Sequence, residues 1–251
     1  MKEDLTLDDF LGGRVQVYQP RKGYRAGVDP VLLAAAICAK PGQSVLELGC
    51  GVGVASLCLA KRVADLEITG LELQPEYAEF ARRNAELNDA SFAVVQGDLG
   101  NLPADLRQQS FDHVLANPPY FEREKSTSAA DRGRETALGE DTPLEEWVKA
   151  AAKRLKPKGT ATFIHRAERL PDLLAAMSER LGSVQILPLV PREGRDTRLV
   201  IVRAKKGGRG PVRLHDSLVL HRGQQHERDE DDYTDQFQAV LRDGQALPFP
   251  E

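Results

Sequence analysis

The sequence predicts an α/β fold, with a mostly parallel sheet and helices on both of its faces. Two observations support this prediction. From residue 44 onward, short apolar runs alternate with stretches of helical length. One of these runs, residues 114–116, stops at Asn117 and two prolines, which cannot donate to a sheet ladder. In open α/β sheets, ligands bind where strands end in this way.

The N-terminal residues predict a small strand or hairpin, a loop and a first helix. Glycines punctuate short alternating runs such as residues 15–18. A helix is expected over Val31–Ala39, with Asp29 as its N-cap and Pro30 at its first position. We divide the chain into an N-terminal extension at the site entrance (1–43), a main domain (44–222) and an acidic C-terminal tail with a short helix (223–251).

A Gly-rich turn follows the first strand of the main domain. The run Ser44-Val-Leu-Glu47-Leu-Gly49-Cys50-Gly51-Val-Gly53 is an apolar strand and a turn, and a helix is expected over residues 54–63. Glycine permits positive φ and close approach of the backbone to a ligand, and the helix N-terminus adds N–H donors. No G-K-[ST] follows, which excludes a phosphate-binding P-loop.

Two further strands end in carboxylates. The strand expected over residues 67–72 ends in Glu72, followed by Leu73, about twenty residues after the glycines, the spacing at which an acid binds ribose hydroxyls in nucleotide sites. A helix over residues 75–88 leads to a strand over 92–96, after which come Asp98 and Leu99.

The fourth strand, residues 111–116, delivers Asn117-Pro118-Pro119-Tyr120. Pro118 forces Asn117 out of the helical region, so the tetrapeptide forms a rigid extended lip. The lip offers a side-chain amide oxygen, a backbone carbonyl and a flat ring. These groups suit a planar molecule that carries an NH₂ group.

A polar stretch, residues 121–143, follows the lip, and we expect it to be a substrate-clamping loop. We interpret His113 and Trp147 as packed side chains and regard a site role for His165 as unlikely. The remaining elements expected are helices over 143–155, 168–181 and 235–242, the last capped by Thr234, and strands over 160–165, 183–187, 197–203 and 212–220.

Charge and cysteine content narrow the class of protein. The net charge is −4, yet nine Arg or Lys lie between residues 192 and 222, and an acidic run follows at 227–232. A local basic face and a merely solvated surface both fit this pattern. Cys38, Cys50 and Cys58 have no metal-ligand spacing, so we expect buried thiols in a reducing cytoplasm and no metal site. The absence of a signal-like or membrane-spanning apolar run predicts no membrane association.

Asn-Pro-Pro-Tyr at 117–120 resembles motif IV of the S-adenosylmethionine-dependent amino-methyltransferases. The E-x-G-x-G-x-G run beginning at Glu47 resembles motif I of the class I methyltransferases. The resemblance implies a Rossmann-like, seven-stranded fold, S-adenosylmethionine as cofactor, and residues 117–120 as the catalytic lip. It also implies contact of Asp98 with the adenine amino group of the cofactor. The cofactor residues expected are Arg25, Asp29, Glu47, Gly49, Cys50, Gly51, Gly53, Glu72, Leu73, Asp98, Leu99 and Asn117.

The run Tyr24-Arg-Ala-Gly27-Val-Asp29-Pro before motif I resembles the bacterial tRNA adenine-N6 methyltransferase family, which modifies the adenosine 3′ of the anticodon of a valine tRNA. The resemblance implies tRNA as partner. It leaves monomer and dimer open, and no obligatory protein partner is visible. The substrate-binding residues expected are Tyr24, Tyr120, Phe121, Arg123, Lys125, Arg195, Arg198, Lys205 and Lys206.

Two alternatives stay open at this point. One is a different acceptor, either a guanine of ribosomal RNA or a glutamine of a release factor. The 43 residues before the first strand are too few for the helical N-terminal domain of the glutamine enzymes. The other is a non-catalytic RNA module that binds S-adenosylmethionine, which has no need of the amide of Asn117.

Overall fold

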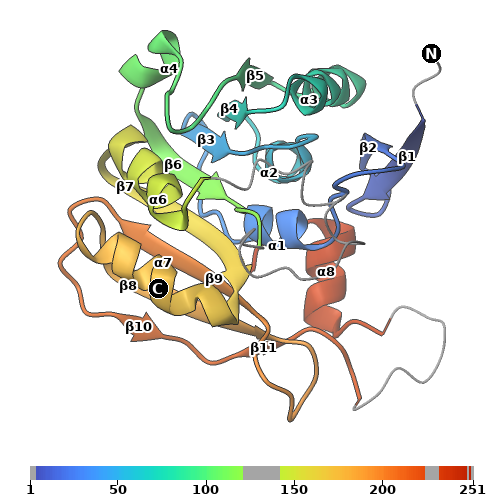
Figure 1. Ribbon diagram of the computed structural model, residues 1–251. Coiled ribbons are helices and arrows are strands. Elements are labelled where there is room, and N and C mark those ends of the chain that lie inside the picture. Colours follow the sequence, from blue (N-terminus) through green and yellow to red (C-terminus); the bar gives the residue numbers. More distant parts are fainter. Residues whose placement is uncertain (1–3, 121–141, 224–231, 248, 250–251) are drawn as a thin grey trace, which may run out of the picture.

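The computed structural model describes residues 4–120, 142–223, 232–247 and 249. A central sheet has the strand order β10-β8-β9-β7-β6-β3-β4-β5, with β11 also paired to β8 (Figure 1). The strands are β3 (Ser44–Leu48), β4 (Glu67–Glu72), β5 (Phe92–Gln96), β6 (Phe111–Ala116), β7 (Leu155–Arg166), β8 (Gly182–Val190), β9 (Leu199–Lys205), β10 (Arg213–Leu214) and β11 (Leu218–Val219).

Strand direction distinguishes two ends of this sheet, one where the parallel strands begin and one where they finish; we call these the amino edge and the carboxyl edge. The run β5-β4-β3-β6-β7 is parallel throughout, whereas β9 runs antiparallel to both β7 and β8. The seven strands from β8 to β5 match the predicted Rossmann-like sheet. The strand expected over residues 212–220 is instead two short strands, β10 and β11, because the polar residues 215–217 separate them.

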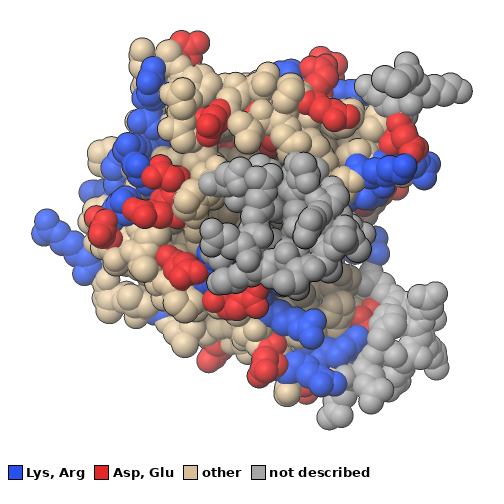
Figure 2. Space-filling view, viewed as in Figure 1, with Lys and Arg blue, Asp and Glu red and all other residues tan. Residues whose placement is uncertain are grey.

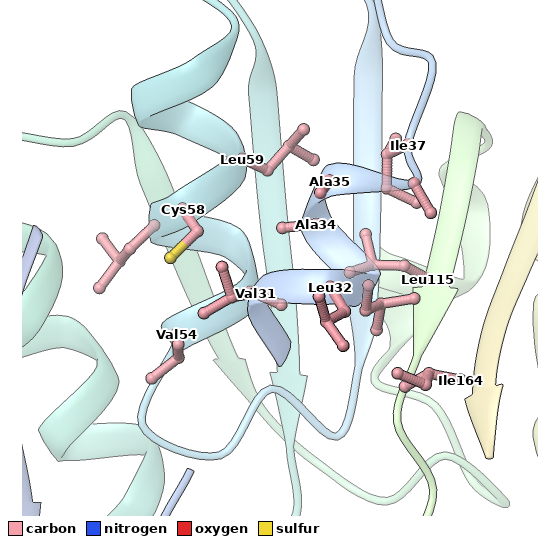
Figure 3. Close-up of a cluster of buried hydrophobic side chains, with 14 of the residues drawn as sticks. Val31, Leu32, Ala34, Ala35, Ile37, Val54, Cys58, Leu59, Leu115 and Ile164 are labelled. Atoms are coloured by element: carbon pink, nitrogen blue, oxygen red, sulfur yellow. The ribbon is translucent and has the colours of Figure 1, made fainter. Parts of the chain in front are cut away.

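Helices cover both faces of the sheet. One apolar cluster contains α1 (Asp29–Ala35), α2 (Val54–Arg62), α3 (Pro75–Leu87) and α8 (Asp235–Asp243). Side chains of α1 and α2, including Leu32, Cys58 and Leu59, meet Leu115 of β6 and Ile164 of β7 in this cluster (Figure 3). The second cluster holds side chains of α4 (Ala104–Gln108), α6 (Leu144–Arg154) and α7 (Leu170–Ser178), the last preceded by the 3₁₀ turn η2 (Ala167–Arg169).

An antiparallel hairpin, β1 (Leu5–Phe10) and β2 (Val15–Pro20), forms a separate two-stranded sheet beside α3. Asn84 of α3 fastens it, because its amide accepts from the Tyr18 backbone N–H at 2.8 Å and donates to the Tyr18 carbonyl at 3.1 Å. These bonds place the loop that follows β2 beside the sheet.

Several local expectations were wrong. Asp29 is not the N-cap of α1, which is Val28; its carboxylate accepts from Tyr120 instead. Thr234 occupies the N-cap position of α8 as expected, but its hydroxyl makes no capping bond and donates to the Val219 carbonyl at 3.1 Å. Helix α1 ends at Ala35 rather than residue 39, so Cys38 lies in the following loop and is exposed, whereas Cys50 and Cys58 are buried as expected. Helix α4 was not foreseen. Of the described helices, none is long and apolar enough to cross a membrane.

Candidate active site

A cavity of about 1060 Å³ opens at the carboxyl ends of β3, β4, β5 and β6. The segment between β2 and α1 and the start of α6 complete its wall. The sequence-predicted residues that line it are Tyr24, Arg25, Asp29, Glu47, Gly49, Cys50, Gly51, Glu72, Leu73, Asp98, Leu99, Asn117, Pro118, Pro119 and Tyr120. Ligand pockets usually have volumes of about 300–1,000 Å³, so this one has room for a nucleoside and more.

The Gly-rich turn after β3 forms the floor of the cavity. Gly49 has φ +65°, and a Cβ added there would lie 2.6 Å from the ring of Trp147. Gly53 has φ +92°, and a Cβ there would lie 2.7 Å from the ring of Phe92. The absence of a side chain at Gly49 therefore lets the Trp147 ring pack directly against the backbone of the turn. Gly53 is the N-cap residue of α2 and does not line the cavity itself.

Glu47 is a buried carboxylate in the cavity wall, 3% exposed. One of its oxygens accepts from the backbone N–H of Ser56 at 3.0 Å and from the Ser56 hydroxyl. Burial raises the pKa of Glu47 to about 8, and the bonds from Ser56 oppose this rise. A cationic ligand in the cavity would favour its ionised form.

Glu72, at the end of β4, reaches back to the glycine turn. Its two oxygens accept from the backbone N–H groups of Gly51 at 2.8 Å and Gln74 at 2.9 Å. Burial raises the pKa of Glu72, and these bonds counter the effect. Each carboxylate oxygen has a second lone pair, so the group can also accept from a ligand. Asp98 lies beyond β5, and its carboxylate accepts from the Gly100 N–H at 2.8 Å.

The lip after β6 carries an unsatisfied polar atom. The side-chain oxygen of Asn117 is buried and has no hydrogen-bond partner among the described residues. Leaving a buried acceptor without a hydrogen bond costs about 1–3 kcal/mol of free energy. A ligand that donates a hydrogen bond to this oxygen would remove that cost and bind more tightly. Because Asn117 also lines the cavity, the N–H group of a bound molecule can supply that donor.

Tyr120 is held by groups from two distant segments. Its hydroxyl donates to Asp29 at 2.5 Å, and its ring centroid lies 5.2 Å from that of His165. The Arg166 guanidinium lies 5.5 Å from the same centroid. Burial and the neighbouring Asp29 charge raise the pKa of the Tyr120 hydroxyl, so it stays a protonated donor. The N-terminal motif and the lip therefore form one structural unit.

The entrance segment is fixed mainly by bonds to its surroundings. The backbone of Tyr24 exchanges two hydrogen bonds with the hydroxyl of Tyr77, at 3.0 and 3.2 Å. The guanidinium of Arg25 donates to Asp8 at 2.5 Å and to Thr6 at 2.7 Å, both in the β1–β2 hairpin. Arg25 thus ties the hairpin to the cavity wall.

The structure does not bring every predicted residue to the cavity. Arg198 lies beside the lip region, because its carbonyl accepts from Ala167 N–H at 2.9 Å, and the exposed Arg195 precedes it in the same loop. Lys205 and Lys206 lie at the opposite edge of the sheet, since β9 is antiparallel to β7. Phe121, Arg123, Lys125, the 121–141 part of the expected clamping loop and residues 227–231 of the acidic run fall outside the described residues.

Sequence reasoning missed three residues at the site. Trp147 is buried, as expected, but its ring also lines the cavity above Gly49. His165 is 2% exposed and packs on Tyr120; burial lowers its pKa to about 4, so its ring is neutral. Tyr77 lines the entrance. Only the end position of His165 on its strand hinted at such a role. His113 is buried as expected and bonds to Gln43 at 3.0 Å.

Comparison with known proteins identifies the family. The methyltransferase small domain matches residues 26–188, which include the glycine turn, both acids and the lip. The chain belongs to the methyltransferase small domain family. It is similar to a Porphyromonas gingivalis protein named tRNA1(Val) (adenine(37)-N6)-methyltransferase, with 35% identity over 73% of this chain and 77% of the relative. A Haemophilus influenzae protein of the same name is 26% identical over 94% of this chain and 98% of its own.

A solved structure agrees with the family assignment. An Agrobacterium tumefaciens protein described as a predicted O-methyltransferase superimposes with a TM-score of 0.68 at 27% identity, covering 87% of this chain and 97% of its own. The fold is thus that of a class I methyltransferase, and the methyl donor is S-adenosylmethionine.

The residues of the cavity fit this donor. It carries an adenosine, a positively charged sulfonium sulfur and an amino-acid end with an ammonium and a carboxylate group. Glu72 and Asp98 place acceptors at the ends of β4 and β5, where ribose and adenine groups need them. Glu47 places a buried carboxylate at the end of β3, where it can stabilise a cation. The glycine turn lets the backbone approach closely between them.

Proposed function

We propose that the chain methylates N6 of an adenine in tRNA, the adenosine 3′ of the anticodon of a valine tRNA, in the cytoplasm. The observation that carries the proposal is the buried side-chain oxygen of Asn117 in the cavity wall, which has no hydrogen-bond partner in the part of the chain that the structure describes. The curated relatives, over most of their length, carry the matching activity in their names.

The lip suits an amine rather than a hydroxyl acceptor. An exocyclic NH₂ group has two N–H donors. One would donate to the side-chain oxygen of Asn117 and the other to the Pro118 carbonyl. Hydrogen bonds to both favour a nitrogen whose lone pair can attack. Such fixed acceptors act by positioning and by electrostatic preorganisation. A hydroxyl has one hydrogen and would leave one acceptor without a donor.

The nitrogen attacks the methyl group on the positively charged sulfur of S-adenosylmethionine, the S–C bond breaks as the N–C bond forms, and the sulfur leaves as a neutral thioether. The methylated nitrogen then releases one proton to water, so no strong base is needed. His165, which packs on Tyr120, agrees with this, since burial lowers its pKa to about 4 and makes it a weak base. Tyr120 would stack on the target base, a contact worth about 1–3 kcal/mol. A base must leave its helical stack to enter the cavity, which is easiest from a single-stranded loop.

The test combines the substrate assay with a change at Asn117. Purified protein is incubated with labelled S-adenosylmethionine and total tRNA, ribosomal RNA or protein from cells lacking the enzyme. Label in tRNA that digests to N6-methyladenosine supports the proposal; label only in ribosomal RNA or protein overturns the substrate.

Asn117→Ala should lower kcat by about 100- to 1,000-fold, the usual loss on removing one preorganised polar group. Affinity for S-adenosylmethionine should stay nearly unchanged. The control Asn101→Ala, at an exposed position, should retain full turnover. Full turnover by Asn117→Ala would refute the role of the lip.

A further inference from the structure

Two basic segments lie side by side at the end of the sheet opposite the cavity. One is the irregular start of β7 (residues 156–159), where the register with β6 shifts, and the other is the turn after β9 (residues 205–210). We name these two segments the β7–β9 patch. Backbone hydrogen bonds join them: Lys158 N–H donates to the Lys206 carbonyl at 3.2 Å, and Lys206 N–H donates to the Gly159 carbonyl at 2.9 Å. The patch contains Lys156, Lys158, Lys205, Lys206 and Arg209, and the segments 153–160 and 202–214 contain no Asp or Glu.

Two of these cations already have partners within the protein. Lys156 pairs with Asp112 at 2.8 Å, and the Lys206 ammonium donates to the Leu155 carbonyl at 2.7 Å. Lys158, Lys205 and Arg209 are exposed, and their side chains have no hydrogen bond or ion pair with any residue the structure describes. The three are therefore available to an external anion.

Backbone conformation and packing fix the two segments that carry these cations. Lys158 has φ +65° at the irregular start of β7, and Gly207, also at positive φ, bends the chain after Lys205 and Lys206. Gly208 is packed against Gly182, and Gly210 N–H donates to the Ser183 hydroxyl at 2.8 Å. Figure 2 shows Lys and Arg side chains gathered along the left edge of the molecule, where strands β6 and β7 begin in Figure 1.

The distance from the patch to the lip follows from the strand register. Lys205 pairs with Thr160, and Leu199 pairs with Arg166, the residue whose guanidinium lies over Tyr120. These six steps along β7 correspond to roughly 20 Å at about 3.3 Å per residue. Duplex DNA places successive phosphates of one strand about 3.4 Å apart along the axis, and the A-form helix of RNA rises less per base pair, so 20 Å spans at least about six base pairs of an RNA stem.

We propose that the β7–β9 patch binds the phosphates of the double-stranded stem that adjoins the target loop, at least about six base pairs from the methylated base. This inference rests on the proposed function. It assigns Lys205 and Lys206 to a surface remote from the cavity and adds Lys158 and Arg209. A stem phosphate backbone suits the patch because it offers regularly spaced charges and needs no base-specific contact.

The experiment compares two RNA hairpins that present the same target loop, one on a stem of three base pairs and one on a stem of eight. Binding is measured by fluorescence anisotropy at several salt concentrations for the wild type and for the triple variant Lys158→Gln, Lys205→Gln, Arg209→Gln. The control variant Lys40→Gln, Lys61→Gln neutralises two exposed lysines of the α1–α2 region. Thermal unfolding checks that each variant is folded.

On the long stem, we expect the triple variant to lower the slope of log affinity against log salt by about 2 to 3, close to one per lost contact. Its KM for the long hairpin rises at least tenfold while kcat stays unchanged. The short hairpin binds both proteins alike, and the control variant keeps the wild-type slope.

Each other outcome overturns the inference in an identifiable way. If the wild type methylates tRNA but the triple variant keeps the wild-type slope, the patch proposal alone is wrong. The same conclusion follows if the short hairpin or the control variant shows an equal loss, since the effect would then come from overall charge. If the wild type methylates no RNA, the proposed function fails and the patch proposal fails with it.

Discussion

The binding of S-adenosylmethionine should depend on the titration of Glu47. Burial raises the pKa of this carboxyl to about 8, and the nearby Glu72 raises it further, against the bonds from Ser56. The usual value is 4.5, so the unliganded protein holds Glu47 protonated at neutral pH. A cationic ligand favours the ionised form and must displace that proton when it binds.

The size of the effect follows from the pKa. With a pKa of about 8, Glu47 is about half ionised at pH 8 and about 1% ionised at pH 6. If binding requires the carboxylate, the Kd for S-adenosylmethionine rises roughly 50-fold from pH 8 to pH 6, or about 2.3 kcal/mol.

The stability of the unliganded protein should change in the opposite direction. A carboxyl whose folded pKa lies above its unfolded value stabilises the fold fully below the unfolded pKa. That contribution is lost as pH rises through the folded pKa, so it declines between about pH 4.5 and pH 8.

Isothermal titration calorimetry at pH 6, 7 and 8 measures the linkage directly. Buffers of different ionisation enthalpy would reveal proton release of nearly one per ligand at pH 6. The control ligand is 5′-methylthioadenosine, which lacks the amino-acid end and should bind with little pH dependence. Glu47→Gln should remove the dependence for S-adenosylmethionine. A Kd that is flat from pH 6 to pH 8, or an unchanged slope in Glu47→Gln, would refute the reasoning.

Two further predictions concern the walls of the cavity. In a double-mutant cycle of Asp29→Ala and Tyr120→Phe, the losses in kcat/KM should couple by about 0.5–3 kcal/mol, because both variants remove the same hydrogen bond; additive losses would show that the bond does not position the ring. Gly49→Ala should weaken S-adenosylmethionine binding at least tenfold, since the new Cβ would lie 2.6 Å from the ring of Trp147 at a φ of +65°. If Gly49→Ala binds normally, or if the paired change Gly49→Ala, Trp147→Phe does no better than Gly49→Ala, the close packing is not what limits the site.

The position of the cavity was predictable because each sequence motif lies at the carboxyl end of a parallel strand. Glu47, Glu72, Asp98 and Asn117 each come at or after the end of a strand, and parallel strands bring their carboxyl ends to one edge. Local patterns of this kind are readable without tertiary information. The mostly parallel sheet followed from the same alternation of strands and helices, whereas the count of seven strands came from the resemblance to the class I methyltransferases.

Contacts between distant segments were not readable in the same way. The Asp29 carboxylate looked like a helix cap, yet it bonds to Tyr120, 91 residues away. Trp147 was predicted as core from its helix face, but nothing local shows that Gly49 lies beneath its ring. These pairings depend on how helices and loops dock on the sheet, which a local pattern does not encode.

Strand direction explains why the basic C-terminal strands divide into two surfaces. The run from Arg195 to Lys206 is one basic segment in the sequence, where a local basic face and a merely solvated surface both fitted the pattern. Because β9 is antiparallel to β7, its start lies beside the lip and its end lies at the amino edge, roughly 20 Å away. If the cavity takes the target base and the patch takes stem phosphates, as we propose, the substrate must be extended and rigid between the two. A base-paired stem has that rigidity, whereas a free nucleotide or a flexible single strand does not, so the direction of one strand favours a structured RNA as substrate.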